Sequence, residues 1–136
     1  MDKFTKRFIE KQLEDYPKMD EYIMQRRLEL KYPIGQTDEN IGGSSSGKIS
    51  NPTERMVVTL ESDKRLCQLE ETKTAIESVL KTLDINAYTL VELKYWIKPQ
   101  TRTWDGIAIK VGYSRRHCFN VRDIIIESIA VKLGMA

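Results

Sequence analysis

The 136-residue sequence contains few of the residues on which metal sites and disulfide frameworks depend. Its two cysteines, Cys67 and Cys118, both fall on the apolar faces of expected helices, and its one histidine is His117. This set does not form a plausible zinc site, and we expect both thiols to stay reduced inside a cell. No apolar run near the N-terminus is long enough for a signal peptide or a membrane span. We therefore expect a cytoplasmic protein that holds no metal or cofactor and enters no membrane.

The residue patterns of catalytic sites are missing as well. His117 is not accompanied by a Cys or Ser nucleophile in any recognisable motif. No pair of carboxylates lies in an apolar stretch that would separate their pKa values. We therefore expect no enzymatic activity.

Positive charge is in small excess and unevenly distributed. The formal net charge is +2, too small for non-specific binding to nucleic acid. Residues 84–136 carry eight Lys and Arg against five Asp and Glu, whereas the rest of the chain carries 14 against 15. The excess therefore lies in the C-terminal part, and contact with a phosphate backbone would require it there.

Residues 101–134 have the residue spacing of a helix-turn-helix. Thr103 is placed to cap a helix over residues 104–111, because its hydroxyl can accept a free backbone N–H of the first turn. Gly112 follows, where a helix ends most easily in the left-handed conformation. Ser114 is placed to cap the second helix.

The second helix of this motif is expected to have a buried face and a basic start. Its apolar residues recur at i, i+3, i+7 and i+11. Arg and Asn, which have bidentate geometry for guanine and adenine, stand among the outward residues near its start. The alternative is that the basic pair belongs to an ordinary solvated face. The inward residues are Cys118, Val121, Ile125 and Ile129, and the outward ones are Arg115, Arg116, His117, Phe119 and Asn120.

Residues 1–33 are expected to form an N-terminal helical region with charges of both signs. Pro17 should break or kink it near residues 15–16, which gives two helices or one bent helix. Apolar residues recur there every seven positions, as in a coiled-coil seam, at Ile9, Tyr16, Ile23 and Leu30.

A polar linker and a long helix are expected next. Residues 34–51 are rich in Gly and Ser and indicate a flexible tether, although a loop that folds onto DNA or a partner is the alternative. Residues 52–83 carry a leucine-rich stripe and predict a helix of about 50 Å. That stripe must be covered by the N-terminal helical region as a hairpin or by another subunit, and we expect a homo-oligomer.

Residues 84–136 are expected to form the DNA-binding domain. A break at residues 84–86 precedes a helix over residues 87–97, which should lie buried under the helix-turn-helix. Trp104 is expected to pack across the crossing of the two helices rather than to contact DNA. The expected fold is therefore all-α, with a helical hairpin or coiled-coil-like N-terminal part and a C-terminal helix-turn-helix.

The last third of the chain resembles region 4 of sigma factors, the promoter-binding region. The segments LVELKYW, TWDGIAIKVGYS and RRHCFNVRD carry the resemblance. It implies that Cys118 and Val121 point inward. Phe119 departs from the pattern, since an aromatic residue stands at an outward position, where it would contact a base or thymine methyl group or join the core. The positions that the resemblance places against DNA are Ser114, Arg115, Arg116, His117 and Asn120.

The whole chain is similar to the RinA/ArpU-like phage transcriptional regulators. The N-terminal segment ending in RRLEL and above all the linker DENIGGSSSGKISNPTE carry this resemblance. It implies a small activator of late-gene operons in phages and prophages of Gram-positive bacteria.

We therefore expect a sequence-specific regulator that places residues 114–133 in the major groove of double-stranded promoter DNA. Its long helical part would set the oligomeric state or touch RNA polymerase in the bacterial cytoplasm. The alternatives are a phage small terminase subunit, which packages DNA, and a protein-interaction module that binds no DNA. Arg102, Lys110 and Arg122 would contact phosphates. The candidate DNA-binding residues are Arg102, Thr103, Lys110, Ser114, Arg115, Arg116, His117, Phe119, Asn120 and Arg122.

Overall fold

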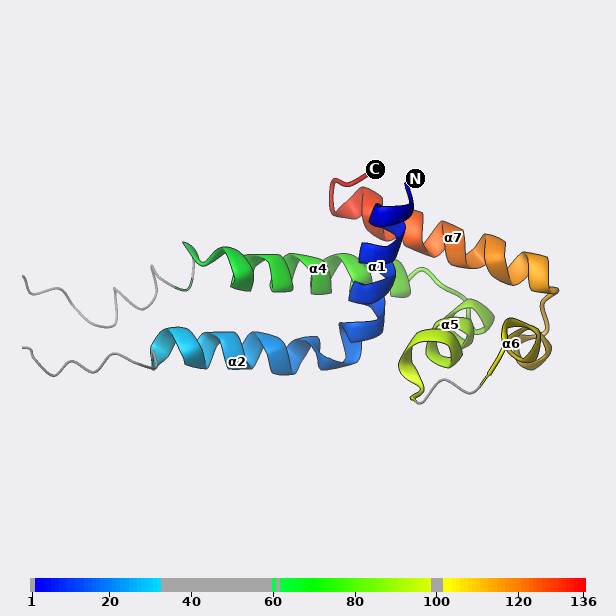
Figure 1. The fold of residues 1–136 in the computed structure, drawn as a ribbon, viewed down its shortest axis with the longest axis horizontal. Helices are drawn as coiled ribbons and strands as arrows, with labels where there is room; N and C mark the ends of the chain where they lie inside the picture. Colours follow the sequence, from blue (N-terminus) through cyan, green and yellow to red (C-terminus); the bar gives the residue numbers. More distant parts are fainter. Residues whose placement is uncertain (1, 33–59, 61, 99–101) are drawn as a thin grey trace, which may run out of the picture. The chain divides into compact units, whose positions relative to one another are not determined.

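The computed structural model describes residues 2–32, 60, 62–98 and 102–136, and no strand occurs among them (Figure 1). The expected all-α fold is confirmed. The predicted linker, residues 34–51, and the start of the predicted long helix lie outside the described residues. The elements are α1 (Lys3–Asp15), the 3-10 turn η1 (Tyr16–Lys18), α2 (Met19–Lys31), α4 (Lys64–Leu80), α5 (Ile85–Val91), the π-helical turn η3 (Glu92–Trp96), α6 (Trp104–Val111) and α7 (Arg115–Lys132).

The chain divides into two compact units. Unit 1 comprises Met1–Lys18 and Glu71–Ala136, and unit 2 comprises Met19–Glu70. The division passes through α4. Residues from both ends of the sequence therefore belong to one unit.

Pro17 separates the two N-terminal helices, as its sequence position predicts. α1 ends at Asp15, and a single 3-10 turn precedes α2. Proline fixes its own backbone and disfavours the helical conformation of the residue before it, which explains the break.

In unit 2, two ion pairs join α2 to the residues at the start of α4. Arg26 binds Asp63 through two hydrogen bonds of 3.0 and 2.8 Å, and Arg27 lies 2.7 Å from Glu70. The Arg26 guanidinium lowers the pKa of Asp63 to about 2. These contacts lie within one chain, and self-association remains a prediction.

The prediction of one unbroken helix over residues 52–83 is wrong at Asp63. This residue is not helical, and its Oδ2 atom accepts the N–H of Leu66 at 2.8 Å, which caps the start of α4. α4 ends at Leu80 rather than at Leu83. The apolar stripe does not indicate the break, because Asp63 lies between the positions of the stripe. The break forms because a short acidic side chain competes for backbone N–H groups.

The break expected at residues 84–86 lies at residues 81–84 instead, between the end of α4 at Leu80 and the start of α5 at Ile85. Asp84 itself caps α5, with its Oδ1 atom 2.8 Å from the N–H of Ala87. The single helix predicted over residues 87–97 is instead α5 followed by the π-helical turn η3.

One buried cluster of unit 1 lies where α5, η3, α6 and α7 meet. Each fully buried aliphatic side chain contributes about 1.5–3 kcal/mol of burial free energy. Ala108 is buried at the α6–α7 contact, where a small side chain lets the helices approach. The buried cluster comprises Leu90, Leu93, Ile107, Ala108, Val111 and Cys118, with Trp104, Tyr113 and Val121 packed around it.

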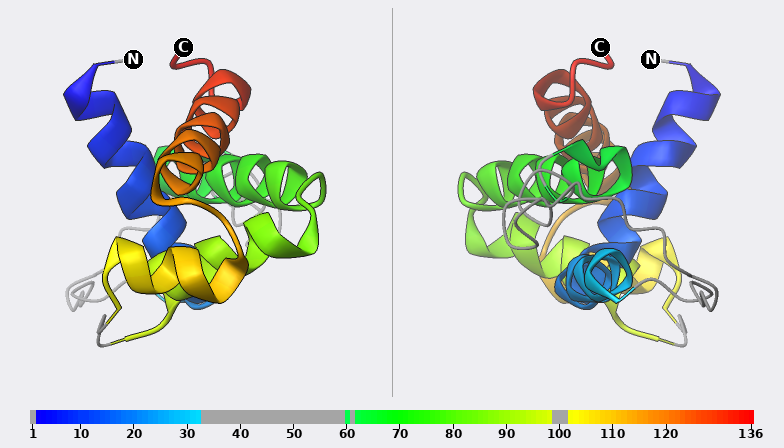
Figure 2. Two further views of the ribbon diagram at one scale, coloured as in Figure 1. Left: turned by 90° about the vertical axis from the view of Figure 1, so that its right-hand side faces the viewer. Right: turned by 90° about the vertical axis from the view of Figure 1, so that its left-hand side faces the viewer.

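Helix α1 is part of unit 1 and packs against α7 and η3 (Figure 2). Its inward residues Ile9 and Leu13, at i and i+4, have no exposed surface. The Trp96 indole N–H donates to the carbonyl oxygen of Leu13 at 2.9 Å. Lys6 forms an ion pair of 3.3 Å with Asp123 of α7. Among the described residues, no helix is long and apolar enough to cross a bilayer.

Candidate nucleic-acid interface

The α6–α7 pair is closed by three local hydrogen-bonded contacts. Thr103 Oγ1 accepts the N–H of Gly106 at 3.1 Å, and Ser114 Oγ accepts the N–H of His117 at 3.0 Å. Gly112, with φ +80°, ends α6 in the left-handed conformation, and its N–H reaches the carbonyl of Ala108 at 2.9 Å. Both predicted caps and the predicted glycine turn are present.

The inward face of α7 is buried as its spacing predicts. Cys118, Ile125 and Ile129 are at most 2 % exposed, and Val121 is half-buried. Burial raises the pKa of the Cys118 thiol, which keeps it protonated. Both cysteines are free thiols. With one face held in this way, the residues on the opposite face point to solvent.

The first turns of α7 present exposed polar side chains. Arg116 and Asn120 are exposed and, among the described residues, make no hydrogen bond or ion pair. They stand at i and i+4 and therefore share one face of the helix. Arg115 lies 3.7 Å from Asp105, a contact between two exposed groups that contributes little. The His117 ring meets Tyr113 edge to face at 4.4 Å.

Cationic and aromatic side chains alternate beside this exposed face. We call this set the cation–aromatic row. Trp104 and Phe119 meet edge to face, with ring centroids 5.1 Å apart. The Arg122 guanidinium lies 5.4 Å from the Trp104 ring and 5.2 Å from the Phe119 ring. The row consists of Lys94, Trp104, Arg122, Phe119 and Arg115.

The contacts of the cation–aromatic row show whether Trp104 and Phe119 belong to the surface or to the core. Trp104 packs against the buried cluster, as predicted. Phe119 is half-buried beside Trp104, so its ring supports neighbouring cations instead of standing free on the surface. Each close cation–ring contact contributes about 0.5–1 kcal/mol at a partly exposed position.

The remaining predicted residues lie on adjoining segments. Arg102 and Lys110 are exposed, one before α6 and one in its last turn. The hydroxyl groups of Thr103 and Ser114 serve as caps. Arg122 is less accessible than a surface arginine, with 18 % of its side chain exposed.

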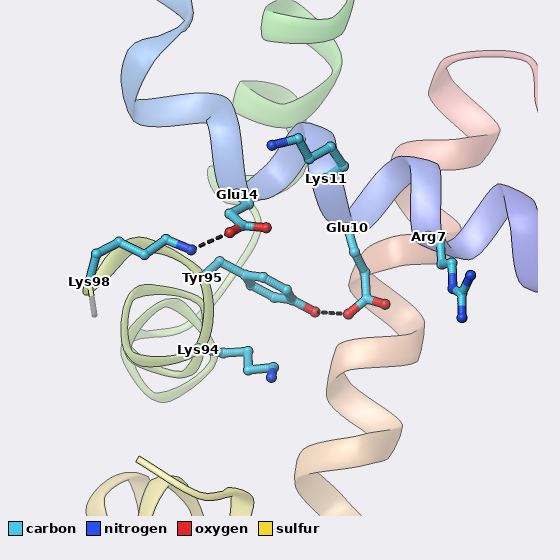
Figure 3. A pocket seen from close by; sticks show the side chains of 7 residues that line it. All are labelled: Arg7, Glu10, Lys11, Glu14, Lys94, Tyr95 and Lys98. Atoms are coloured by element: carbon cyan, nitrogen blue, oxygen red, sulfur yellow. Dashed lines mark hydrogen bonds and ion pairs between the residues drawn. The ribbon is translucent and has the colours of Figure 1, made fainter. Parts of the chain in front are cut away.

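A second cluster of charge lies between α1 and η3 and is missed by sequence reasoning (Figure 3). It lines a pocket of about 460 Å³. Its α1 and η3 residues are at least 80 positions apart in sequence, and no local pattern connects them. The lining residues are Arg7, Glu10, Lys11 and Glu14 with Lys94, Tyr95 and Lys98.

Comparison with known proteins gives two matches over most of the chain. A family model described as "Protein of unknown function (DUF722)" matches residues 5–131. The protein named "Transcriptional activator rinA", from Staphylococcus phage phi11, is 26 % identical over 130 residues, which cover 96 % of this chain and 91 % of the relative. No solved structure matches. The resemblance to RinA-like regulators read from the residues is confirmed.

Proposed function

We propose that this chain regulates transcription by binding DNA. The chain belongs to the DUF722 family and is similar to a phage transcriptional activator over nearly its whole length. The distant homology supports the role of transcription regulator. The observation that carries the DNA-binding proposal is the start of α7. There a capped helix with one buried face presents Arg116 and Asn120, neither paired within the described chain.

In this proposal α7 enters the major groove with its first turns. Arg115 and Arg116 read guanine or anchor phosphates, and Asn120 reads adenine through its carboxamide. Arg102, Lys110 and Arg122 contact the phosphate backbone and fix the register of the helix. The free N–H groups at the start of a helix add attraction for phosphate.

The biological target that we propose is a late-gene promoter of a phage or prophage. The protein would act there as an activator that contacts RNA polymerase and binds as a homo-oligomer. A dimer would then recognise half-sites about one helical turn apart, or a multiple of that distance.

Capture of fragmented source-genome DNA by the purified protein tests this target. Enrichment upstream of a late operon would support the activator, and the shared sequence would give the half-site spacing. Enrichment beside terminase genes without a promoter would indicate a packaging adaptor instead. No enrichment would favour a protein-interaction module.

The double substitution Arg115→Ala with Arg116→Ala tests the recognition helix. Each bidentate base contact contributes about 1–3 kcal/mol, so we expect the preference for the target over random duplex to fall by at least tenfold. Both side chains are exposed, so helicity and thermal stability should change little. The measurement is titration of labelled target and random duplexes.

The matched control is Lys81→Ala with Lys132→Ala, which removes the same charge from exposed positions outside the proposed interface. Lys132 lies about 25 Å along α7 from Arg115 at 1.5 Å per residue. This control should retain sequence preference. Normal target binding by the arginine variant would show that the start of α7 is not the reading element.

A further inference from the structure

The pocket between α1 and η3 has no role in the function proposed above. We propose that it binds the DNA phosphate backbone beside the groove that α7 enters, so that α1 is part of the DNA-binding surface. This inference rests on the proposed function. It assigns Arg7 and Lys94 as phosphate contacts.

The pocket is cationic even though two carboxylates line it. Four basic residues line it against two acidic ones, and one of the four, Lys11, pairs with Asp15 at 3.3 Å, which leaves one positive charge in excess. Glu10 accepts the Tyr95 hydroxyl at 2.6 Å, and Glu14 pairs with Lys98 (Figure 3). The hydrogen bond from Lys98 lowers the pKa of Glu14, which holds this carboxylate in its charged, paired form. Both acidic groups are therefore engaged inside the pocket.

Arg7 and Lys94 are the two cations of the pocket that we assign to the phosphate contacts. Arg7 is exposed and, within the described part of the chain, has no hydrogen bond or ion pair. Lys94 is half-buried and comes from η3. Figure 3 shows the two side chains on opposite sides of the Tyr95–Glu10 hydrogen bond. Two separated cations suit successive phosphates of a backbone better than one small anion.

Lys94 joins the pocket to the proposed recognition surface. Its ammonium lies 5.1 Å from the centroid of the Trp104 ring, and Trp104 contacts Phe119 on α7. Arg115 lies over the other end of the row, 5.2 Å from the Phe119 centroid. The pocket, the cation–aromatic row and the start of α7 thus form one continuous surface. This continuity favours a nucleic-acid backbone over an acidic protein segment.

Helix α1 is held firmly enough to present such a contact. Tyr95 is 5 % exposed, and its hydroxyl ties η3 to α1 through Glu10. The Lys6–Asp123 ion pair and the buried residues Ile9 and Leu13 hold the same helix within unit 1. A phosphate that binds Arg7 would therefore be positioned relative to α7.

The test is the salt dependence of duplex binding by the full chain with Arg7→Gln and Lys94→Gln. Each lost phosphate contact lowers the slope of log affinity against log salt by about 0.9, so we expect a slope shallower by about two. Between 50 and 200 mM salt, the wild type should then lose about tenfold more affinity than the variant. The ratio of target to random-duplex affinity should not change.

Controls separate this inference from the proposed function. Lys81→Gln with Lys132→Gln removes the same charge elsewhere and should keep the wild-type slope. Arg7→Gln alone leaves the Lys94–Trp104 contact intact and should lower the slope by about one. Circular dichroism checks that each variant folds.

Each other outcome decides between the two ideas. Suppose that the wild type binds its target specifically and that the pocket variants show the same slope of log affinity against log salt as the wild type. The pocket inference is then overturned and the proposed function stands. If the control pair lowers the slope equally, the pocket has no special role and the inference is also overturned. If the wild type binds no duplex, both the function and the inference are wrong.

Discussion

Gly112 offers a direct test of how the α6–α7 turn is built. Its φ of +80° is a conformation that costs an L-residue about 1–2 kcal/mol. A Cβ atom placed there would meet nothing within 4 Å, so no clash contributes to a substitution. Alanine also lowers the entropy of the unfolded chain, which offsets about 0.4–1 kcal/mol. We expect Gly112→Ala to destabilise unit 1 by about 1 kcal/mol net.

Gly106 provides the matched control in the same helix. It lies in the first turn of α6, and an added Cβ would lie 3.5 Å from Thr103 Oγ1, an ordinary contact. Alanine is favoured over glycine in a helix, so Gly106→Ala should stabilise by up to about 0.5–1 kcal/mol. The two substitutions add the same methyl group and should change stability in opposite directions.

Urea unfolding followed by tryptophan fluorescence measures both effects. Trp96 and Trp104, the two tryptophans of the chain, both belong to unit 1 and report on the unit that contains the turn. The midpoint should fall for Gly112→Ala and rise for Gly106→Ala. The midpoint should fall less for Gly112→Asn than for Gly112→Ala, because asparagine tolerates the left-handed conformation. An unchanged midpoint for Gly112→Ala would refute the claim that this turn needs a positive φ.

Two further substitutions test contacts made by buried or paired side chains. Tyr95→Phe removes the hydrogen bond to the Glu10 carboxylate and should destabilise unit 1 by about 1–2 kcal/mol in urea unfolding. An unchanged free energy of unfolding would show that this bond does not hold α1. Arg26 lowers the pKa of Asp63 from 3.8 to about 2. The pair therefore stabilises unit 2 fully at pH values above 3.8, and this stabilisation is lost as the pH falls toward 2. By circular dichroism, Asp63→Asn should therefore show lower helicity than the wild type at pH 5 and the same helicity near pH 2. An equal difference in helicity between variant and wild type at both pH values would contradict the pairing.

Several parts of the fold that depend on local chemistry were predictable from sequence, although the Asp63 cap of α4 was not. Thr103 and Ser114 precede their helices by one position and cap them, and Gly112 ends α6 where no Cβ is tolerated without strain. Pro17 likewise ends α1 through its own ring. In each case the cause and the effect lie within a few residues of one another.

The parts that depend on distant residues were not predictable. The spacing of Ile9 and Leu13 indicates that α1 has a buried face, but it does not say that the face meets α7 and η3. Lys94 lies in an expected buried helix, and its contact with Trp104 follows from the placement of α6. Phe119 could not be assigned to surface or core until its partner ring was known.

The discontinuous makeup of unit 1 has a consequence for its biosynthesis. α1 leaves the ribosome before its partners, because the Tyr95 hydroxyl that binds it lies 85 residues later and α7 later still. At about 5–20 residues per second, the helix waits several seconds for these partners. An isolated helix of this length is marginal in water, so α1 should acquire stable structure only after translation of α7. Folding of the proposed DNA-binding unit would thus wait for the synthesis of α7, with a rate set by the closure of a long chain segment.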